Sequence, residues 1–216
     1  MKHHAIFDLD GTLLDTERIA IAALKKAFRQ YGYEADDRSL HQCIGISRPD
    51  TTALFSRLFP KAPMDRVLEQ MHEEIDKAVA EHTLPVKQGI SKLLEALKTK
   101  GCRMAVATST PFAIAQEKLE QKYLMSYFKV LIGGDMITNG KPAPDIFLLA
   151  AEKLDADPDD CQVFEDSGPG IQAAHAAGMR VIYIKDIARP TEEALQLCFR
   201  KFENADEVLT VIDSLL

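Results

Sequence analysis

The sequence predicts an α/β fold built on a parallel sheet, and two recurring patterns predict it. Short apolar runs end at polar clusters, which is typical of strands that are buried on both faces. These runs are residues 5–7, 104–107, 130–132, 163–164 and 181–184. From residue 86 onward they alternate with stretches whose apolar side chains repeat at helical spacing. We therefore expect a three-layer, Rossmann-like core in which helices cover both faces of the sheet.

The helices of this core are predicted from apolar spacing and from stop signals. Apolar residues repeat at helical spacing from Ile90 to Leu97, and Gly101 marks the end of that helix. Pro142 is expected to open a second helix that continues to Leu154. A third helix should cover residues 170–177 and end at Gly178.

Residues 16–85 break the alternation. Helical spacing runs from Ile19 to Tyr31 and again over residues 54–59 and 64–79, and no strand-like run occurs between them. We predict an all-helical domain at residues 16–85, inserted into a core domain made of residues 1–15 and 86–216. Two linkers, near residues 15–16 and 83–86, would join the two domains.

Composition narrows the possible partners. Of 216 residues, 46% are hydrophobic and 27% are charged, which is an ordinary globular balance. The formal net charge of -7 argues against nucleic acid as a general partner. No apolar run approaches the roughly 18 residues of a membrane helix. We expect a soluble, cytoplasmic monomer whose four separated cysteines are reduced thiols.

Polar residues at the predicted strand ends are the candidate site, because ligands of open parallel sheets bind beyond the carboxyl ends of the strands. They are Asp8, Asp10, Thr108, Ser109, Lys141, Glu165 and Asp166. Four of the seven are acidic and would repel one another without a cation among them. Mg²⁺ prefers oxygen ligands and commonly binds through one or two carboxylates together with a substrate phosphate. Thr108 and Ser109 lie where we expect a helix to begin, a favourable place for an anion, and Lys141 supplies a compact positive charge for a phosphate oxygen.

Four segments resemble, in order, the four motifs of the haloacid dehalogenase superfamily in its phosphatase form. They are FDLDGTLLDT at residues 7–16, ATST at 107–110, GKPAPD at 140–145 and FEDSGPG at 164–170. The helical insertion resembles the C1 cap of the β-phosphoglucomutase-like branch. The ordered set covers nearly the whole chain and is far more specific than one DxD motif.

The resemblance implies a role for each of these residues. Asp8 would be the nucleophile that forms an aspartyl-phosphate, and Asp10 the general acid and later the general base. Mg²⁺ would be held by Asp8, the backbone carbonyl of Asp10 and Asp166, with Glu165 supporting the metal from outside its direct ligands. Thr108, Ser109 and Lys141 would bind the phosphoryl group.

The resemblance also implies that the cap selects the substrate. Gly45-Ile46-Ser47-Arg48 is similar to a substrate-facing cap loop of this branch, so Arg48 would meet the distal part of the substrate. Glu17 would also face the cleft. The expected function is a Mg²⁺-dependent phosphatase that acts on a small phosphomonoester, such as a sugar phosphate.

Three other functions are alternatives to a phosphatase. A phosphosugar mutase of this branch carries Lys and Asn after the second motif, where this chain has Pro111 and Phe112, and a cap histidine that residues 17–23 lack. A non-catalytic, receiver-like module would be shorter and would have no helical insertion. A haloacid dehalogenase needs neither Asp10 nor Mg²⁺.

Overall fold

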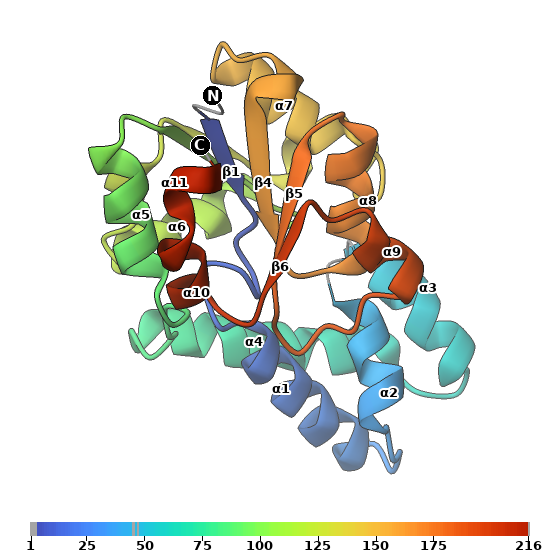
Figure 1. Ribbon diagram of the computed structural model, residues 1–216. Helices are drawn as coiled ribbons and strands as arrows, with labels where there is room; N and C mark the ends of the chain where they lie inside the picture. Colours follow the sequence, from blue (N-terminus) through green and yellow to red (C-terminus); the bar gives the residue numbers. More distant parts are fainter. Residues whose placement is uncertain (1–3, 45, 47, 216) are drawn as a thin grey trace.

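The computed structural model describes residues 4–44, 46 and 48–215 and has one parallel sheet at its centre (Figure 1). Its six strands are arranged in the order β3-β2-β1-β4-β5-β6. The strands are β1 (His4–Phe7), β2 (Arg103–Ala107), β3 (Val130–Ile132), β4 (Cys161–Glu165), β5 (Arg180–Ile184) and β6 (Arg200–Phe202). The first strand is central because it pairs with both β2 and β4.

Successive residues of the central strand pack on opposite faces of the sheet, as strand geometry requires. Ala5 and Phe7 join one buried cluster, and Ile6 joins the other. One face is covered by α5 (Ile90–Thr99), α6 (Phe112–Gln121), α10 (Ala205–Thr210) and α11 (Ile212–Leu215). The other is covered by α7 (Asp145–Lys153), α8 (Gly168–Ala176) and α9 (Glu192–Gln196). The predicted three-layer α/β fold is confirmed.

Between β1 and α5 the chain forms a helical insertion, which consists of α1 to α4. These helices are α1 (Glu17–Gln30), α2 (Asp37–Leu40), α3 (Arg48–Leu58) and α4 (Met64–Ala80). They bury a separate core in which Leu24 and Phe28 of α1 pack with Phe55 and Val67. Figure 1 shows the insertion beyond the carboxyl ends of the strands, next to the edge at which the site is predicted.

The chain leaves and re-enters the core through two connections that lie side by side. The N–H of Asp15 donates to the carbonyl of Pro85, and the N–H of Lys87 donates to the carbonyl of Leu13, both over 2.9 Å. Leu14 and Val86 form an antiparallel bridge between them. The insertion is therefore attached to the core by one short, backbone-paired hinge.

Some elements differ from the prediction. The edge strand β6 was not predicted, because Arg200 and Lys201 are exposed and give it no apolar run. The helix expected from Pro142 begins at Asp145 instead, since residues 140–143 form a turn in which the N–H of Ala143 donates to the carbonyl of Gly140. Short 3₁₀ helices, which the sequence patterns did not predict, cover His41–Cys43, Met125–Tyr127, Gly134–Met136 and Pro158–Asp160.

Two further observations concern the cysteines and the lengths of the helices. All four cysteines are free, with Cys102 and Cys161 buried and the other two half-buried. In the described part of the chain, no helix is both long and apolar enough to cross a bilayer.

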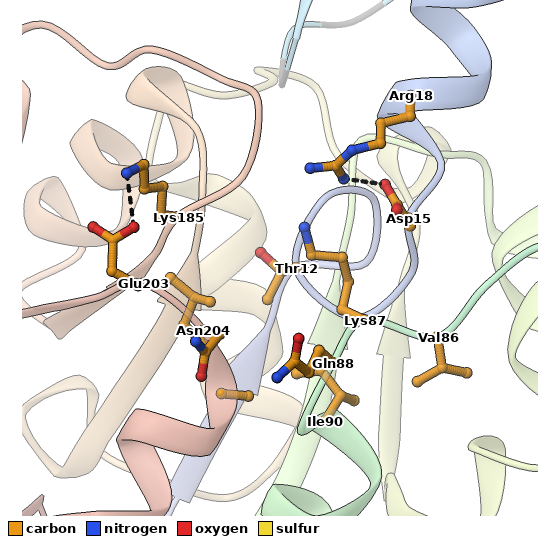
Figure 2. A pocket seen from close by; sticks show the side chains of 12 residues that line it. Thr12, Asp15, Arg18, Val86, Lys87, Gln88, Ile90, Lys185, Glu203 and Asn204 are labelled. Atoms are coloured by element: carbon orange, nitrogen blue, oxygen red, sulfur yellow. Dashed lines mark hydrogen bonds and ion pairs between the residues drawn. The ribbon is translucent and has the colours of Figure 1, made fainter.

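A buried aspartate ties the insertion to the core beside the hinge. Asp186, whose side chain is 0% exposed, accepts hydrogen bonds from Arg18 of α1 over 2.9 Å and from Lys87 of the second connection. Both cations line a pocket of about 390 Å³. Figure 2 shows the Lys87 ammonium between the Thr12 loop and the Asp15–Arg18 ion pair, with the Lys185–Glu203 pair on the opposite side.

Replacing Asp186 by alanine is expected to lower the free energy of unfolding by about 3 kcal/mol, because it breaks a buried ion pair and leaves Lys87 without this partner. Urea unfolding at neutral pH measures the effect. As a control, Lys185→Ala breaks an exposed pair with Glu203 and should cost less than about 1 kcal/mol. Equal losses in the two variants would contradict the buried role of Asp186.

Candidate active site

The strand order brings three of the predicted site segments together. Asp8 directly follows β1, Thr108 directly follows β2, and Glu165 is the last residue of β4. Since β2 and β4 flank β1, these three strand ends are neighbours at one edge of the sheet. The N–H of Asp8 donates to the carbonyl of Phe164 over 3.0 Å, and this hydrogen bond holds the end of β1 against β4.

Lys141 connects the first and third strand ends. Its Nζ donates to Asp8 Oδ1 over 2.5 Å and to Glu165 Oε1 over 2.7 Å, and its side chain is 1% exposed. Nζ also lies 5.0 Å from the centre of the Phe147 ring. Burial opposes the charged form, but the attraction of the two carboxylates outweighs it and raises the pKa of Lys141. The lysine therefore stays a cation at physiological pH.

Glu165 has both of its oxygens occupied. Oε1 accepts from Lys141, and Oε2 accepts from the backbone N–H groups of Asp166 and Ser167, each over 2.7 Å. Gly170 of α8 lies so close that an added Cβ would come within 1.7 Å of Oε1. Glu165 therefore orients Lys141 and the following backbone, which is compatible with its predicted supporting role.

Asp166 has one satisfied oxygen and one that is not. Oδ1 accepts from the Thr12 hydroxyl over 2.9 Å, while Oδ2 is buried and has no hydrogen-bond partner. Gly11, at φ +86°, approaches so closely that an added Cβ would lie 2.4 Å from this oxygen. A buried carboxylate oxygen without a partner is costly unless a cation compensates for it.

The electrostatics of the site fit a bound cation. Burial, with the charges of Glu165 and Asp8, raises the pKa of Asp166 well above its usual range. Burial also raises the pKa of Asp8 to about 7, because desolvation, aided by repulsion from Glu165 and Asp10, outweighs the attraction of Lys141. No three acidic, histidine or cysteine side chains converge as a metal cage within the described residues. Mg²⁺ needs no such cage, since waters and substrate phosphate complete its coordination.

Asp10 has different neighbours. Its Oδ1 accepts from Lys118 Nζ over 2.8 Å, and its Oδ2 accepts from the Thr110 hydroxyl over 2.6 Å and from that of Thr108 over 3.5 Å. Burial favours the neutral acid, but Lys118 and Thr110 outweigh it and lower the pKa of Asp10. Two carboxyl groups two residues apart thus have pKa values shifted in opposite directions.

Lys118 and Thr110 were not predicted as site residues. One signal was available for Lys118, which lies on the buried side of α6 with Ala115 and Leu119, where a lysine interrupts an apolar face. The position of Ser109 corrects another expectation. The helix expected to begin at Thr108 and Ser109 begins at Phe112, because a bend at Ser109 and Thr110 and then Pro111 precede it, and Ser109 is half-buried.

Of the two predicted cap residues, the structure describes the side chain of Glu17 and not that of Arg48. Glu17 is the first residue of α1 and is half-buried. The charges of Asp10 and Asp8 act on its carboxyl group. Burial, together with Asp10 and Asp8, raises its pKa to about 8. Arg48 begins α3, and its side chain is outside the described part of the structure, as are Gly45 and Ser47.

The fold places carboxylates paired with buried lysines at the carboxyl ends of parallel strands, and comparison with known families identifies the class of protein. The chain belongs to the haloacid dehalogenase-like hydrolase family, whose model matches residues 5–184. Membership confirms the predicted resemblance and the prediction that the protein is an enzyme.

Several curated relatives are similar over most of the chain. A phosphorylated carbohydrates phosphatase from Thermotoga maritima is 37% identical over 82% of this chain and 82% of its own. The fructose-1-phosphate phosphatase YqaB of Escherichia coli is 33% identical over 83% and 95%, respectively. The β-phosphoglucomutase of Bacillus subtilis is 33% identical over 81% and 79%.

Solved structures extend the similarity to nearly the whole chain. A hydrolase from Pseudomonas syringae has a TM-score of 0.83 at 26% identity and covers 98% of each chain. CbbY from Rhodobacter sphaeroides, solved in complex with phosphate, has a TM-score of 0.78 at 27% identity and covers 96% of each chain.

Gly170→Ala is expected to destabilise the protein by about 2 kcal/mol, because the new methyl group overlaps Glu165 and forces it away from Lys141. Thermal unfolding measures the loss. The matched control is Gly168→Ala on the same helix, where the nearest atom to an added Cβ is 3.7 Å away. The control should be neutral or slightly stabilising, and an equal loss in both variants would disprove the close-contact argument.

Asp8→Asn is expected to stabilise the metal-free protein near pH 8 and to have less effect near pH 4. The pKa of Asp8 rises from 3.8 to about 7 on folding, so this group contributes stability at low pH that is lost as pH rises through about 7. Asparagine stays neutral and has no such loss. Urea unfolding in EDTA at a series of pH values measures the difference. Asp213→Asn, at an exposed position on α11, is the control. If the difference in the free energy of unfolding between Asp8→Asn and wild type does not widen as the pH rises, the raised pKa of Asp8 is contradicted.

Proposed function

We propose that the protein is a Mg²⁺-dependent phosphatase that hydrolyses a small phosphomonoester through an aspartyl-phosphate on Asp8. The observation that supports this most is the arrangement of Lys141, Asp8 and the unpartnered Asp166 oxygen. A cation is already bonded to the proposed nucleophile, and a second cation is needed beside it. This combination suits a dianionic phosphoryl group better than a neutral substrate.

In the first step, an Asp8 carboxylate oxygen attacks phosphorus. The bond from phosphorus to the alcohol oxygen breaks, and that oxygen takes a proton from Asp10 and leaves as the free alcohol. Lys141 is bonded to Asp8 Oδ1, so it lies where a phosphoryl oxygen would arrive and can neutralise its charge.

In the second step, Asp10, now ionised, accepts a proton from a water molecule that attacks phosphorus. The bond from phosphorus to Asp8 breaks, which releases inorganic phosphate and restores the carboxylate. Asp10 ends the cycle protonated, so acid and base roles alternate on one group. The lowered pKa of Asp10 favours the base that this second step needs and opposes the acid that the first step needs, so the first step requires the negative charge of the bound phosphoryl group to raise that pKa again.

Three groups would hold Mg²⁺, namely the Asp8 carboxylate, the backbone carbonyl of Asp10 and Asp166. When bound, the ion neutralises phosphoryl charge and the repulsion among the carboxylates. Thr12 and Gly11 prepare Asp166 for it, because the hydroxyl fixes Oδ1 while the close glycine backbone leaves Oδ2 without a protein donor. Thr108, which directly follows β2, and Ser109 would bind the phosphoryl group together with Lys141.

The substrate class is proposed from the relatives and from the insertion. Two relatives are named for phosphorylated carbohydrates and for fructose 1-phosphate, so a sugar phosphate or a related metabolite is the favoured substrate. We propose that residues 16–85 act as a cap over the strand ends and that Glu17 and Arg48 contact the part of the substrate beyond the phosphate. Glu17, held neutral by its surroundings at moderate pH, would offer a hydrogen-bond donor to a sugar hydroxyl.

A phosphosugar mutase is the second candidate, because one relative is named β-phosphoglucomutase. Pro111 and Phe112 lack the polar groups that the mutase pattern has after the second motif, and residues 17–23 contain no histidine. Both departures favour hydrolysis.

The test is release of inorganic phosphate from p-nitrophenyl phosphate and from a panel of sugar phosphates. Turnover should require Mg²⁺, stop with EDTA and return when Mg²⁺ is restored. Asp8→Asn should fold and lose at least about 10⁴-fold in kcat, because the nucleophile is gone. Asp213→Asn should behave as wild type. Wild-type-like rates from Asp8→Asn, or activity that EDTA leaves unchanged, would refute the proposal, and isomerised sugar phosphate without free phosphate would favour the mutase.

A further inference from the structure

A second buried lysine lies beside the proposed site, and neither the sequence motifs nor the proposed chemistry assigns it a role. Lys118 is in the second half of α6, with its side chain 5% exposed. It lies on the same face as Ala115 and Leu119, which pack in the main core. An apolar residue would fill this position without an electrostatic cost.

The partner of Lys118 is Asp10. Its Nζ lies 2.8 Å from Asp10 Oδ1, and the Asp10 side chain is itself only 19% exposed. Bringing an ammonium group and a carboxylate out of water costs several kcal/mol per ion, which their attraction repays only when geometry is good. Good geometry is present here, because the second Asp10 oxygen is also bonded, to Thr110 over 2.6 Å.

The two oxygens of Asp10 are therefore chemically different. Oδ1 faces an ammonium group, which has three N–H donors and no acceptor. Oδ2 faces the hydroxyls of Thr110 and Thr108, which can donate to a carboxylate oxygen or turn and accept from a protonated one. The ammonium group that bonds Oδ1 cannot accept a hydrogen bond from a proton on it, whereas the two hydroxyls that bond Oδ2 can accept one.

We infer that Lys118 is a positioning residue that fixes the orientation of the Asp10 carboxyl group and restricts its transferable proton to Oδ2. The inference rests on the proposed function, in which Asp10 gives a proton to the leaving oxygen. Lys118 acts through Asp10 and does not itself bind substrate. With one oxygen anchored from α6 and the other from the end of β2, the carboxyl group cannot rotate to exchange its two oxygens without breaking both contacts.

The consequence is measurable because proton donation matters only for leaving groups that need it. The p-nitrophenolate ion leaves without a proton, but phenolate and alkoxide are poorer leaving groups. A well-placed general acid makes kcat/KM nearly insensitive to the acidity of the leaving phenol, and losing it makes the dependence steep. A residue that only stabilised the fold would lower the amount of active enzyme for every substrate equally.

The experiment compares kcat/KM for p-nitrophenyl phosphate and for phenyl phosphate in the Mg²⁺-loaded full-length enzyme. Lys118→Met, which keeps the length without the charge, should lower the value for phenyl phosphate by about tenfold or more and that for p-nitrophenyl phosphate by less than about threefold. Lys118→Arg, which keeps a cationic donor, should recover most of the loss. Lys122→Met is the matched control, one turn further along, where the lysine donates to the backbone carbonyl of His82 over 2.9 Å.

Asp10→Asn separates the inference from the proposed function. This variant should lose more kcat/KM for phenyl phosphate, relative to p-nitrophenyl phosphate, than Lys118→Met does. If it does not, the acid role of Asp10 is wrong. If Asp10→Asn shows the selective loss while Lys118→Met keeps the wild-type ratio of the two substrates, the inference about Lys118 is overturned. Should Lys118→Met fail to fold, Lys118→Gln gives the same test, because its amide can both donate and accept and so no longer restricts the proton. A wild-type ratio in that variant would equally overturn the inference.

Discussion

The pair of hydrogen bonds that Lys141 makes with Asp8 and Glu165 is the interaction on which the rest of the site depends. One buried ammonium group holds the ends of β1 and β4 in contact. Glu165 in turn fixes the backbone of Asp166 and Ser167 at the start of α8. A single cation thus couples the proposed nucleophile to the proposed metal ligand, although the two lie more than 150 positions apart in the sequence.

The site divides into two halves with different electrostatics. Around Asp8 and Asp166, burial and repulsion between carboxylates favour the protonated form in the absence of a metal ion. Around Asp10, Lys118 and Thr110 favour the ionised form without any metal. The protein thereby gives two identical residues two positions apart opposite pKa shifts, by placing each against a different lysine, which suits the different roles proposed for them.

The sequence was sufficient to predict the sheet, the helical insertion and the convergence of Asp8, Asp10, Thr108, Lys141, Glu165 and Asp166, because these follow from apolar runs and motifs. It could not predict β6, whose exposed Arg200 and Lys201 carry no periodic signal. Lys118 was missed for a different reason. From the sequence alone, a lysine within a helix is expected to be exposed to solvent. Only the tertiary structure shows that Lys118 faces Asp10. The helix start after Ser109 was misplaced because Pro111 delays it to Phe112.

The hinge has a consequence for how such proteins diversify. Leu13 to Asp15 and Pro85 to Lys87 run antiparallel and bond to each other, so the chain departs and returns at almost one point. For the sheet, the intervening seventy residues are equivalent to a long loop closed at its base. Lineages can then exchange, lengthen or reshape that loop while the strand register beneath it stays intact. By this route the substrate selectivity that we propose for residues 16–85 can change while the strand-end residues are inherited unchanged.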